Sequence, residues 1–172
     1  MRFSELFRFC PVCGSAHFVS HNLKSKRCGS CGFVMYVNPA AAVAVFVENE
    51  SGELLVCTRA KEPASGTWDL PGGFVDENET VFDAVARELY EELGLTIKDP
   101  EFMFSLPNEY LYSGWTIPTL DFFFSVRVAD NVSLIASDDV SDCFFMAKEA
   151  VESTRFGLKS IQQAVKIFLK PI

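Results

Sequence analysis

The sequence predicts a mixed α/β (α+β) protein, preceded by a small four-cysteine module. Segments with the pattern of strands alternate with two or three helical segments, which favours a sheet covered by helices. Two closely spaced cysteine pairs precede all of these segments. With 172 residues, 49% of them hydrophobic, the chain can bury one full core and a small appendage. We therefore expect two domains, at residues 1–38 and 39–172.

The small module contains two CxxC pairs separated by 14 residues. The four side chains are Cys10, Cys13, Cys28 and Cys31. This spacing is typical of a zinc ribbon, in which two knuckles present four thiolates tetrahedrally. The rival interpretations are two disulfides or a redox CxxC, but a cytoplasmic chain keeps its cysteines reduced. Four thiolates close the shell of the ion, so we expect the zinc to be structural.

The remaining cysteines and the histidines are not expected to bind zinc. His17 and His21 lie between the two cysteine pairs and are predicted to be surface or packing residues, because four thiolates are already present. Cys57 and Cys143 lie in apolar strand patterns, which favours small buried side chains.

The larger domain opens with a predicted hairpin. Residues 40–47 form an apolar run typical of a central strand, and after a short turn residues 54–59 form the returning strand. Arg59 ends that strand and either reaches a phosphate or pairs with an acid. A polar loop then leads to Gly72 and Gly73, which permit a close backbone approach.

A helix is predicted between Thr80 and Gly94. Thr80 and Asp83 can form a capping box at its amino end, and Gly94 suits a left-handed residue at its carboxyl end. The 3.6-residue period separates two faces. The apolar face carries Phe82, Val85, Ala86, Leu89 and Leu93. The opposite face carries Glu88, Glu91 and Glu92.

The three glutamates are neighbours on the helix, because their spacings are i,i+3 and i,i+4. Like charges at these spacings weaken a helix. A divalent cation would reverse the repulsion, and magnesium takes a few carboxylates while keeping positions for waters and substrate phosphates. A solvated acidic face is the alternative interpretation, since most charge runs on helices are of that kind.

Further strands and helices follow the acidic helix. Strands are predicted at 101–106, 119–128 and 143–146. Helices are predicted at 147–152 and at about 157–169, the second with one apolar stripe.

The stretch 73–95 resembles the Nudix box at every defining position. Gly73 and Glu79 precede, at the required spacing, the run Arg87-Glu88-Leu89-Tyr90-Glu91-Glu92-Leu93-Gly94-Leu95. The resemblance implies the Nudix α/β/α sandwich, with a mixed sheet between helices, which agrees with the alternation of strands and helices. It implies a Nudix hydrolase that cleaves a nucleoside diphosphate linked to another moiety. It implies that Mg²⁺ or Mn²⁺ is held by the three glutamates and by a backbone carbonyl at Gly72 or Gly73. It also implies that Arg87 orients the glutamates by bidentate pairing and that Glu79 participates.

A four-cysteine ribbon directly ahead of a Nudix domain resembles the NADH pyrophosphatase branch of the family, over about residues 10–95. That branch carries a Ser-Gln-Pro-Trp-Pro-Phe-Pro-x-Ser array after the box. Here the corresponding residues 105–113 retain the first Ser, the first Pro and the last Ser. The resemblance therefore implies a diphosphate-linked substrate, but not that NADH is preferred.

Two further sets of candidate residues come from this region. Tyr110, Tyr112 and Trp115 offer rings that can stack on a base, although aromatic residues in such a loop often pack beneath it. Asp139 stands where the NADH pyrophosphatase branch has a metal-binding glutamate, and its side chain is one methylene shorter.

The distribution of charge along the chain indicates which binding partners to expect. Residues 1–39 carry five basic groups and one acid, whereas the remainder carries ten basic and 22 acidic groups. A basic ribbon suggests nucleic-acid binding, but it has no interleaved aromatic platform and the acidic remainder would repel a phosphate backbone. We expect a small nucleotide as the partner and no nucleic acid. The chain shows no membrane-length apolar run and no signal peptide, so a cytoplasmic location without membrane contact is predicted.

The sequence therefore predicts a pyrophosphohydrolase dependent on Mg²⁺ or Mn²⁺, acting on substrates of the ADP-ribose, NADH or sugar-nucleotide type. The alternative is a non-catalytic or RNA-associated nucleotide-sensing module that uses the ribbon for binding. The complete set of box acids argues against that alternative. A homodimer is expected by analogy with ribbon-type relatives.

Overall fold

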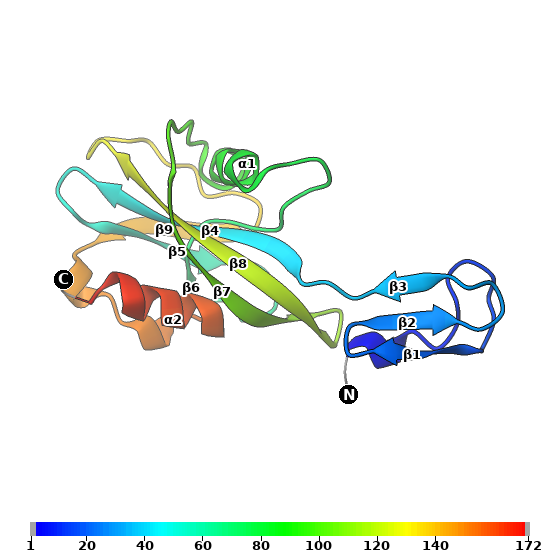
Figure 1. Ribbon diagram of the computed structural model, residues 1–172. Helices are drawn as coiled ribbons and strands as arrows, with labels where there is room; N and C mark the ends of the chain where they lie inside the picture. Colours follow the sequence, from blue (N-terminus) through cyan, green and yellow to red (C-terminus); the bar gives the residue numbers. More distant parts are fainter. Residues whose placement is uncertain (1–2, 171–172) are drawn as a thin grey trace. The chain divides into compact units, whose positions relative to one another are not determined.

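The computed structural model describes residues 3–170, and their contacts divide them into two units (Figure 1). The described part of the first unit comprises residues 3–39 and 109–118. The second comprises residues 40–108 and 119–170. Within the described residues, no helix has the length and apolar character needed to cross a membrane. The cytoplasmic location stays a prediction.

The amino-terminal part of the first unit is a small three-stranded sheet. A short 3-10 helix, η1 (Phe3–Leu6), precedes β1 (Phe18–Asn22), β2 (Ser25–Cys28) and β3 (Val34–Tyr36), which pair antiparallel in that order. Its core is small. The buried members are Cys10, Phe18 and Cys28, with Phe7, Phe33 and Met35 packed against them. A hydrophobic core of this size is too small to stabilise a fold alone, so a cross-link such as a bound metal ion is needed.

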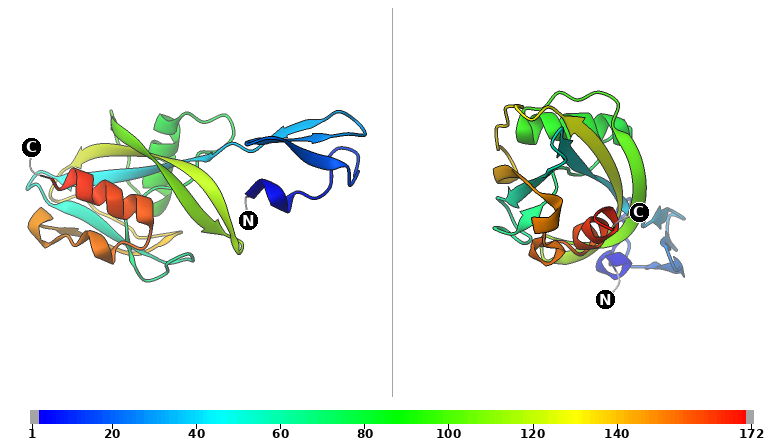
Figure 2. Two further views of the ribbon diagram at one scale, coloured as in Figure 1. Left: turned by 60° about the horizontal axis from the view of Figure 1, so that its bottom comes forward. Right: turned by 90° about the vertical axis from the view of Figure 1, so that its left-hand side faces the viewer.

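The second unit is built on a mixed sheet, as predicted. The strands of this sheet are β4 (Ala40–Asn49), β5 (Leu54–Arg59), β6 (Trp68–Asp69), β7 (Glu101–Tyr112), β8 (Trp115–Val128) and β9 (Val140–Met146), of which residues 109–112 and 115–118 are counted with the first unit. The order is β6-β5-β4-β8-β7, with β9 paired to β5. β4 runs antiparallel to β5 and parallel to β8. Figure 2 shows the strands curving between two helices.

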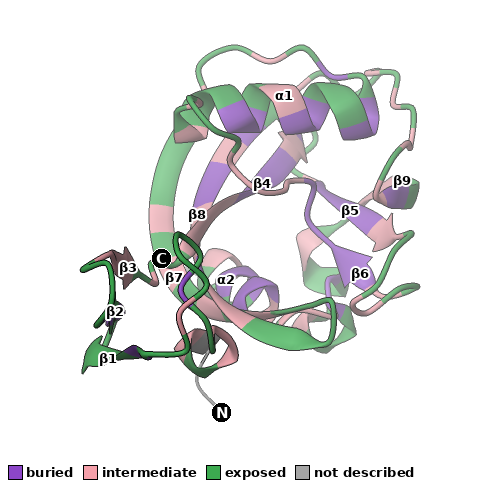
Figure 3. Cartoon of the chain, turned by 90° about the vertical axis from the view of Figure 1, so that its right-hand side faces the viewer, coloured by how far each residue is buried: buried purple, intermediate pink, exposed green. Residues whose placement is uncertain are grey.

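The two helices cover opposite faces of this sheet. Residues of α1 (Val81–Leu93) pack with Val45, Leu55 and Phe124, whereas residues of α2 (Lys159–Phe168) pack with Phe46 and Phe123. Figure 3 shows the buried side of each helix directed toward the strands. Successive residues of a strand point to opposite faces, so Val45 packs in the core between the sheet and α1, and Phe46 packs in the core between the sheet and α2. The expected α/β/α sandwich is confirmed.

The helix predicted at 147–152 is wrong. The chain there forms two single 3-10 turns, η2 (Lys148–Ala150) and η3 (Ser153–Arg155). Val151 lies between them in an extended conformation, with its side chain buried. Burying this side chain interrupts the helical path. The helix predicted at about 157–169 is confirmed as α2.

The region expected to be a loop after residue 106 is instead a hairpin. β7 continues to Tyr112 and β8 begins at Trp115, so only Ser113 and Gly114 connect them. Both connecting residues have positive φ, 49° and 80°. Positive φ at both positions characterises the type I′ turn, whose twist matches that of the strands it joins. Tyr110, Tyr112 and Trp115 therefore lie on strands.

Candidate active site

The helix α1 begins and ends where the sequence predicts. The Thr80 hydroxyl accepts a hydrogen bond from the Asp83 N–H at 3.2 Å, and the Asp83 carboxylate accepts one from the Thr80 N–H at 2.9 Å. Gly94 is left-handed, with φ of 67°, and its N–H donates to the Tyr90 carbonyl. These local signals fix the register in which the helix presents its glutamates.

The two faces of α1 differ from the prediction. Val85, Leu89 and Leu93 are buried as expected, but Ala86 is exposed. Phe82 is 48% exposed, although its ring meets that of Phe124 edge-on. The acidic face is solvated only in part: Glu91 is exposed, but only 8% of Glu88 and 3% of Glu92 is exposed. Tertiary contacts therefore bury part of the polar face of α1 as well as its apolar face. The 3.6-residue period of the sequence predicts only the burial of the apolar face.

The backbone around Gly72 and Gly73 provides this cover. The Val45 N–H donates to the Pro71 carbonyl at 2.9 Å, and the Val43 N–H donates to the Gly73 carbonyl at 2.8 Å. The loop thus lies against β4 like an added strand. Gly72 has φ of 147°, and a Cβ there would lie 2.1 Å from the Val43 carbonyl oxygen. The close approach expected of the two glycines is confirmed.

Gly73 makes room for a carboxylate. A Cβ on Gly73 would lie 2.3 Å from Oε1 of Glu88 and 2.6 Å from its Cδ. Any larger residue would displace this carboxylate. The glycine loop and α1 therefore fit each other at the position of Glu88.

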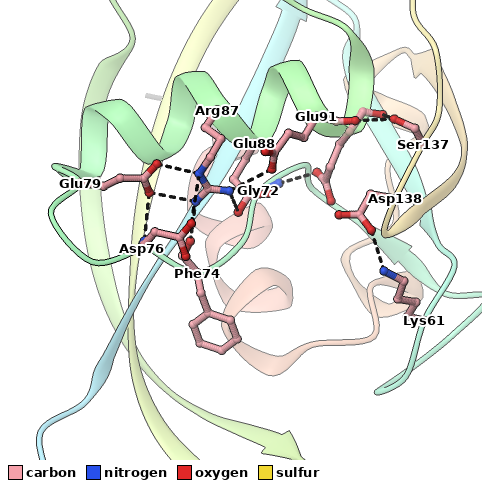
Figure 4. A network of polar contacts seen from close by, with 11 residues as sticks. Lys61, Gly72, Phe74, Asp76, Glu79, Arg87, Glu88, Glu91, Ser137 and Asp138 are labelled. Carbon is pink, nitrogen blue, oxygen red and sulfur yellow. Dashed lines mark hydrogen bonds and ion pairs between the residues drawn. The ribbon is translucent and has the colours of Figure 1, made fainter.

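Arg87 holds several acids together (Figure 4). Its Nε and Nη2 donate to the two carboxylate oxygens of Glu79 at 2.7 and 2.9 Å. Its Nη1 donates to Glu88 at 2.8 Å and to Glu91 at 3.1 Å. The bidentate partner is thus Glu79, and the two helix glutamates receive single bonds. Hydrogen bonds from Arg87 lower the pKa of Glu79 to about 2.

Glu92 is the most deeply placed acid of the box. Its Oε2 accepts a hydrogen bond from the Gly72 N–H at 2.9 Å. Burial raises its pKa to about 8, and the charges of Glu88, Asp69 and Asp139 act in the same direction. Burial also raises the pKa of Glu88. A buried carboxylate among other acids is stabilised in its charged form by a cation.

A second acidic segment lies against the carboxyl end of α1. The Ser137 N–H donates to the Glu92 carbonyl at 2.9 Å, and the Ser137 hydroxyl donates to the Glu91 carbonyl. The next two residues, Asp138 and Asp139, each pair with the Lys61 ammonium at 2.6 Å. Ser137 and Lys61 were not singled out from the sequence. A serine just before two aspartates gives little indication that it will satisfy helix carbonyls.

A small polar cavity of about 20 Å³ lies beside Glu92. Its lining residues are Cys57, Arg59, Asp69, Leu70, Gly72, Glu92, Asp139 and Val140. This volume holds about one water molecule. Arg59 forms an ion pair with Asp69, and both side chains are 10% exposed. Of the two roles expected for Arg59, the structure shows the pairing with an acid, and the phosphate contact stays a prediction.

The candidate base-stacking residues belong to the first unit. Tyr112 and Trp115 are 59% and 50% exposed, and Tyr110 is partly buried. Their exposure leaves ring surface available, and their role in binding a base stays a prediction.

The four cysteines fit a zinc ion. The Sγ atoms of Cys10 and Cys31 are 3.7 Å apart, and those of Cys13 and Cys28 are 3.6 Å apart. Zinc–sulfur bonds of about 2.3 Å in a tetrahedron place sulfurs roughly 3.8 Å apart. His17 and His21 are exposed, and Cys57 is fully buried. The cysteine cluster has the arrangement expected of a zinc ribbon.

The glutamates of α1 show a different arrangement. Among residues 3–170, the four cysteines are the one group of three or more metal-ligating residues whose ligand atoms all come within 4.8 Å of each other. Glu88 and Glu91 are held by Arg87, whereas Glu92 is held by the Gly72 N–H. The donors are nonetheless carboxylate and carbonyl oxygens, which suit Mg²⁺, and Glu92 is buried with no basic side chain from residues 3–170 paired to it. The residues present fit such an ion.

Comparison with known proteins agrees with this site. The family model of the NUDIX domain matches residues 38–164. The chain belongs to the Nudix family. The resemblance inferred from the box is therefore confirmed, as is the mixed α+β fold class. The Nudix family is one of hydrolases, which agrees with the class of enzyme expected from the sequence.

Curated relatives cover part of the chain. The NAD-capped RNA hydrolase NudC of Vibrio parahaemolyticus is 30% identical over 118 residues, 67% of this chain and 41% of the relative. The protein of that name from Chromobacterium violaceum is 34% identical over 104 residues, 60% of this chain and 38% of the relative. The ADP-ribose pyrophosphatase of Methanocaldococcus jannaschii is 44% identical over 64 residues, 37% of each protein. The Nudix chain spans about two fifths of the length of these relatives.

Solved structures share the fold. A NUDIX hydrolase from Nitrosomonas europaea superposes with a TM-score of 0.72 at 23% identity, covering 94% of this chain and 90% of that one. The NUDIX domain of Shewanella oneidensis NrtR, solved with ADP ribose, gives a TM-score of 0.61 at 20% identity, covering 76% and 89%. At these identities the likeness concerns the fold alone.

Proposed function

We propose that this protein is a pyrophosphohydrolase, dependent on Mg²⁺ or Mn²⁺, that cleaves a nucleoside diphosphate linked to another moiety. The observation that carries the proposal is the pair of buried carboxylates, Glu88 and Glu92, facing the glycine loop beside a polar cavity. Glu88 is paired with Arg87, but Glu92 has no basic partner among residues 3–170. Burying a carboxylate without such a partner is unfavourable, so its retention here indicates a function that uses it.

The acids of α1 supply the metal site in this proposal. Glu88, Glu91 and Glu92 are the carboxylate ligands, and a carbonyl of the glycine loop completes the protein donors. Because the Gly73 carbonyl accepts a hydrogen bond from Val43, Gly72 is the better candidate for that carbonyl. When bound, the metal neutralises phosphate oxygens and lowers the pKa of a water that attacks phosphorus.

The remaining residues orient these ligands. Arg87, held by Glu79 on one side, keeps Glu88 and Glu91 at one end of the helix face. Ser137 attaches the segment of Asp139 to the carboxyl end of α1, which places a further acid on the wall of the cavity. Zinc at the four cysteines holds the ribbon together and takes no part in hydrolysis.

The substrate is expected to be diphosphate-linked and not a nucleoside triphosphate. The relatives named NAD-capped RNA hydrolase and ADP-ribose pyrophosphatase are named for compounds that join a nucleoside diphosphate to a second group. We propose that NADH is not the best substrate, because most of the Trp-Pro-Phe-Pro array is replaced here.

A substrate panel tests the proposal. Purified protein with Mg²⁺ or Mn²⁺ is given ADP-ribose, NADH, sugar nucleotides, nucleoside triphosphates and an NAD-capped oligonucleotide, and the products are separated. We expect nucleoside monophosphate from one or more diphosphate-linked compounds, with a lower kcat/KM for triphosphates. Absence of turnover with every member would contradict the proposal and favour a binding module.

The aromatic residues of the β7–β8 hairpin provide a test of base recognition. Tyr110→Ala, Tyr112→Ala and Trp115→Ala are compared separately, because stacking on one ring contributes about 1–3 kcal/mol. Loss of the stacking ring should raise KM roughly ten- to a hundredfold with kcat nearly unchanged. Unchanged KM in all three variants would mean that the base is recognised elsewhere.

A further inference from the structure

The ion pair between Arg59 and Asp69 belongs to the wall of the cavity beside Glu92. Cys57 lies directly opposite Asp69 in the pairing of β5 with β6. Arg59 is two residues beyond Cys57 on the same strand, so all three side chains point to one face of the sheet. The register of two short strands therefore brings one guanidinium and one carboxylate together at the cavity.

The two partners are held from outside the pair as well. The Arg59 Nε donates to the Pro63 carbonyl at 2.8 Å, and the Asp69 Oδ1 accepts from the Leu70 N–H at 2.9 Å. Both side chains are nine-tenths buried. A buried carboxylate that lost its guanidinium, or a buried guanidinium that lost its carboxylate, would be strongly destabilised.

Two other acids in the lining of the cavity are alternative partners for the Arg59 guanidinium. Glu92 and Asp139 line it together with Asp69, and Arg59 is the one basic residue in its lining. Within the part of the chain that the structure describes, Glu92 has no basic partner of its own, and Asp139 pairs with the exposed Lys61. A guanidinium that was not held in place would be drawn toward these two carboxylates, of which the proposed function assigns Glu92 to the metal.

We propose that Asp69 is a positioning residue: it fixes Arg59 at the edge of the cavity, where the guanidinium serves the substrate diphosphate and is kept off Glu92 and Asp139. The inference rests on the proposed function and adds a residue to it. Bidentate geometry makes arginine suited to phosphate oxygens, but it also makes arginine a strong partner for carboxylates. In this proposal, the ion pair with Asp69 leaves Arg59 placed for phosphate oxygens and prevents it from pairing with Glu92 or Asp139.

The test combines substrate kinetics with direct metal binding. Asp69→Asn keeps the size of the side chain and the acceptor for Leu70, but releases the charge of Arg59. We expect KM for the best diphosphate-linked substrate to rise roughly tenfold with kcat within a few fold, and the Kd for Mn²⁺, measured by electron paramagnetic resonance without substrate, to rise about tenfold.

A double variant separates positioning from stability. Arg59→Met removes the competing cation, so adding it to Asp69→Asn should restore Mn²⁺ affinity while KM stays high. Glu48→Gln is the matched control, since it breaks the ion pair with Lys148 elsewhere on the sheet and should alter neither quantity. A merely structural Asp69 would lower the melting temperature and leave both KM and Mn²⁺ affinity unchanged.

Clear outcomes overturn the inference. Normal KM and normal Mn²⁺ affinity in Asp69→Asn, beside an active wild type, would overturn it without touching the proposed function. A wild type that hydrolyses no member of the panel would overturn the proposed function, and the Mn²⁺ titrations would still test Asp69. If Asp69→Asn does not fold, Asp69→Glu replaces it, because the longer side chain keeps the charge but shifts the guanidinium of Arg59. A wild-type KM in that variant would overturn the inference.

Discussion

The four cysteines of the ribbon and the three glutamates of α1 are both sets of metal ligands by sequence pattern, but the structure holds them differently. The sulfur atoms already stand at the spacing of a zinc tetrahedron. The carboxylates instead have protein partners, Arg87 for Glu88 and Glu91 and the Gly72 N–H for Glu92. If the two sets bind the metals proposed, a permanent structural ion is matched here by a closed, preformed shell. An exchangeable catalytic ion would instead be matched by ligands that keep protein partners of their own.

The difference has a local cause in the ribbon. The Gly14 N–H donates to the Cys10 carbonyl at 2.9 Å, and the Gly32 N–H donates to the Cys28 carbonyl at 3.0 Å. Each CxxC pair is thus closed by its own backbone turn. The glutamates depend instead on a loop twenty residues away in sequence, because Glu92 is bonded to Gly72.

Removing zinc tests the preformed four-cysteine site. It has the largest expected effect on stability among these predictions. Structural zinc contributes apparent binding free energies of about 10–16 kcal/mol in small modules. We expect one zinc per chain, and after its removal faster hydrogen exchange in the ribbon with metal-dependent hydrolysis retained. Cys143→Ser is the control and should not alter zinc content. Absence of zinc, or two disulfides found by mass spectrometry, would refute the ribbon site.

The glutamate site should respond to pH in a way that the cysteine site does not. Burial raises the pKa of Glu92 from 4.5 to about 8, so the folded protein binds this proton more tightly than the unfolded chain. Without divalent cation, the free energy of unfolding should therefore fall between about pH 4.5 and pH 8, by on the order of a few kcal/mol, and level off above that.

Glu92→Gln removes the titrating group and should flatten this slope. Urea unfolding between pH 5 and pH 9 measures it, in dialysed buffer that contains no chelator. Added Mn²⁺ should stabilise the wild type most at the alkaline end, because it favours the charged form of Glu92. An equal slope in wild type and Glu92→Gln would show that another group is responsible.

Two neighbouring glycines sharpen the comparison further, because the loop that holds the glutamates needs each of them for a different reason. Gly72→Ala places a Cβ against the backbone of β4 at positive φ and should cost about 2–4 kcal/mol in urea unfolding. Gly73→Ala meets only the carboxylate end of Glu88, so stability should change by less than about 1 kcal/mol.

The smaller change in stability at Gly73 should come with a loss of activity. Displacing the Glu88 carboxylate should lower kcat roughly tenfold or more. Gly52→Ala is the control for Gly72→Ala, since both glycines have positive φ but Gly52 has open space around its Cβ position. If Gly73→Ala retains full kcat, the position of Glu88 does not matter for turnover.

Much of the fold could be predicted from the sequence because its signals are local. The capping box of Thr80, the left-handed Gly94 and the apolar run of β4 each depend on a few adjacent residues. The turn at Ser113 and Gly114 is also local, yet it was missed, because the prediction ended the preceding strand at Leu106. An edge strand with alternating exposure gives a weaker signal than a buried one.

The candidate site could be predicted only in part. The box identified the acids, but their burial depends on the loop that adds itself to β4, which no periodicity on α1 encodes. In the same way, Arg87 takes Glu79 as its bidentate partner because the chain before the helix turns back toward it. The pairing of Arg59 with Asp69 follows from the register of β5 and β6, which the sequence leaves open.

The most direct test of the account measures both metal sites in the same samples. Wild type, Glu91→Gln and Glu92→Gln are titrated with Mn²⁺ by electron paramagnetic resonance, analysed for zinc, and assayed on the best substrate of the panel. The account predicts one zinc per chain in all three proteins, with Mn²⁺ affinity and turnover reduced by orders of magnitude in the two variants. Normal Mn²⁺ binding and hydrolysis by both variants would contradict it.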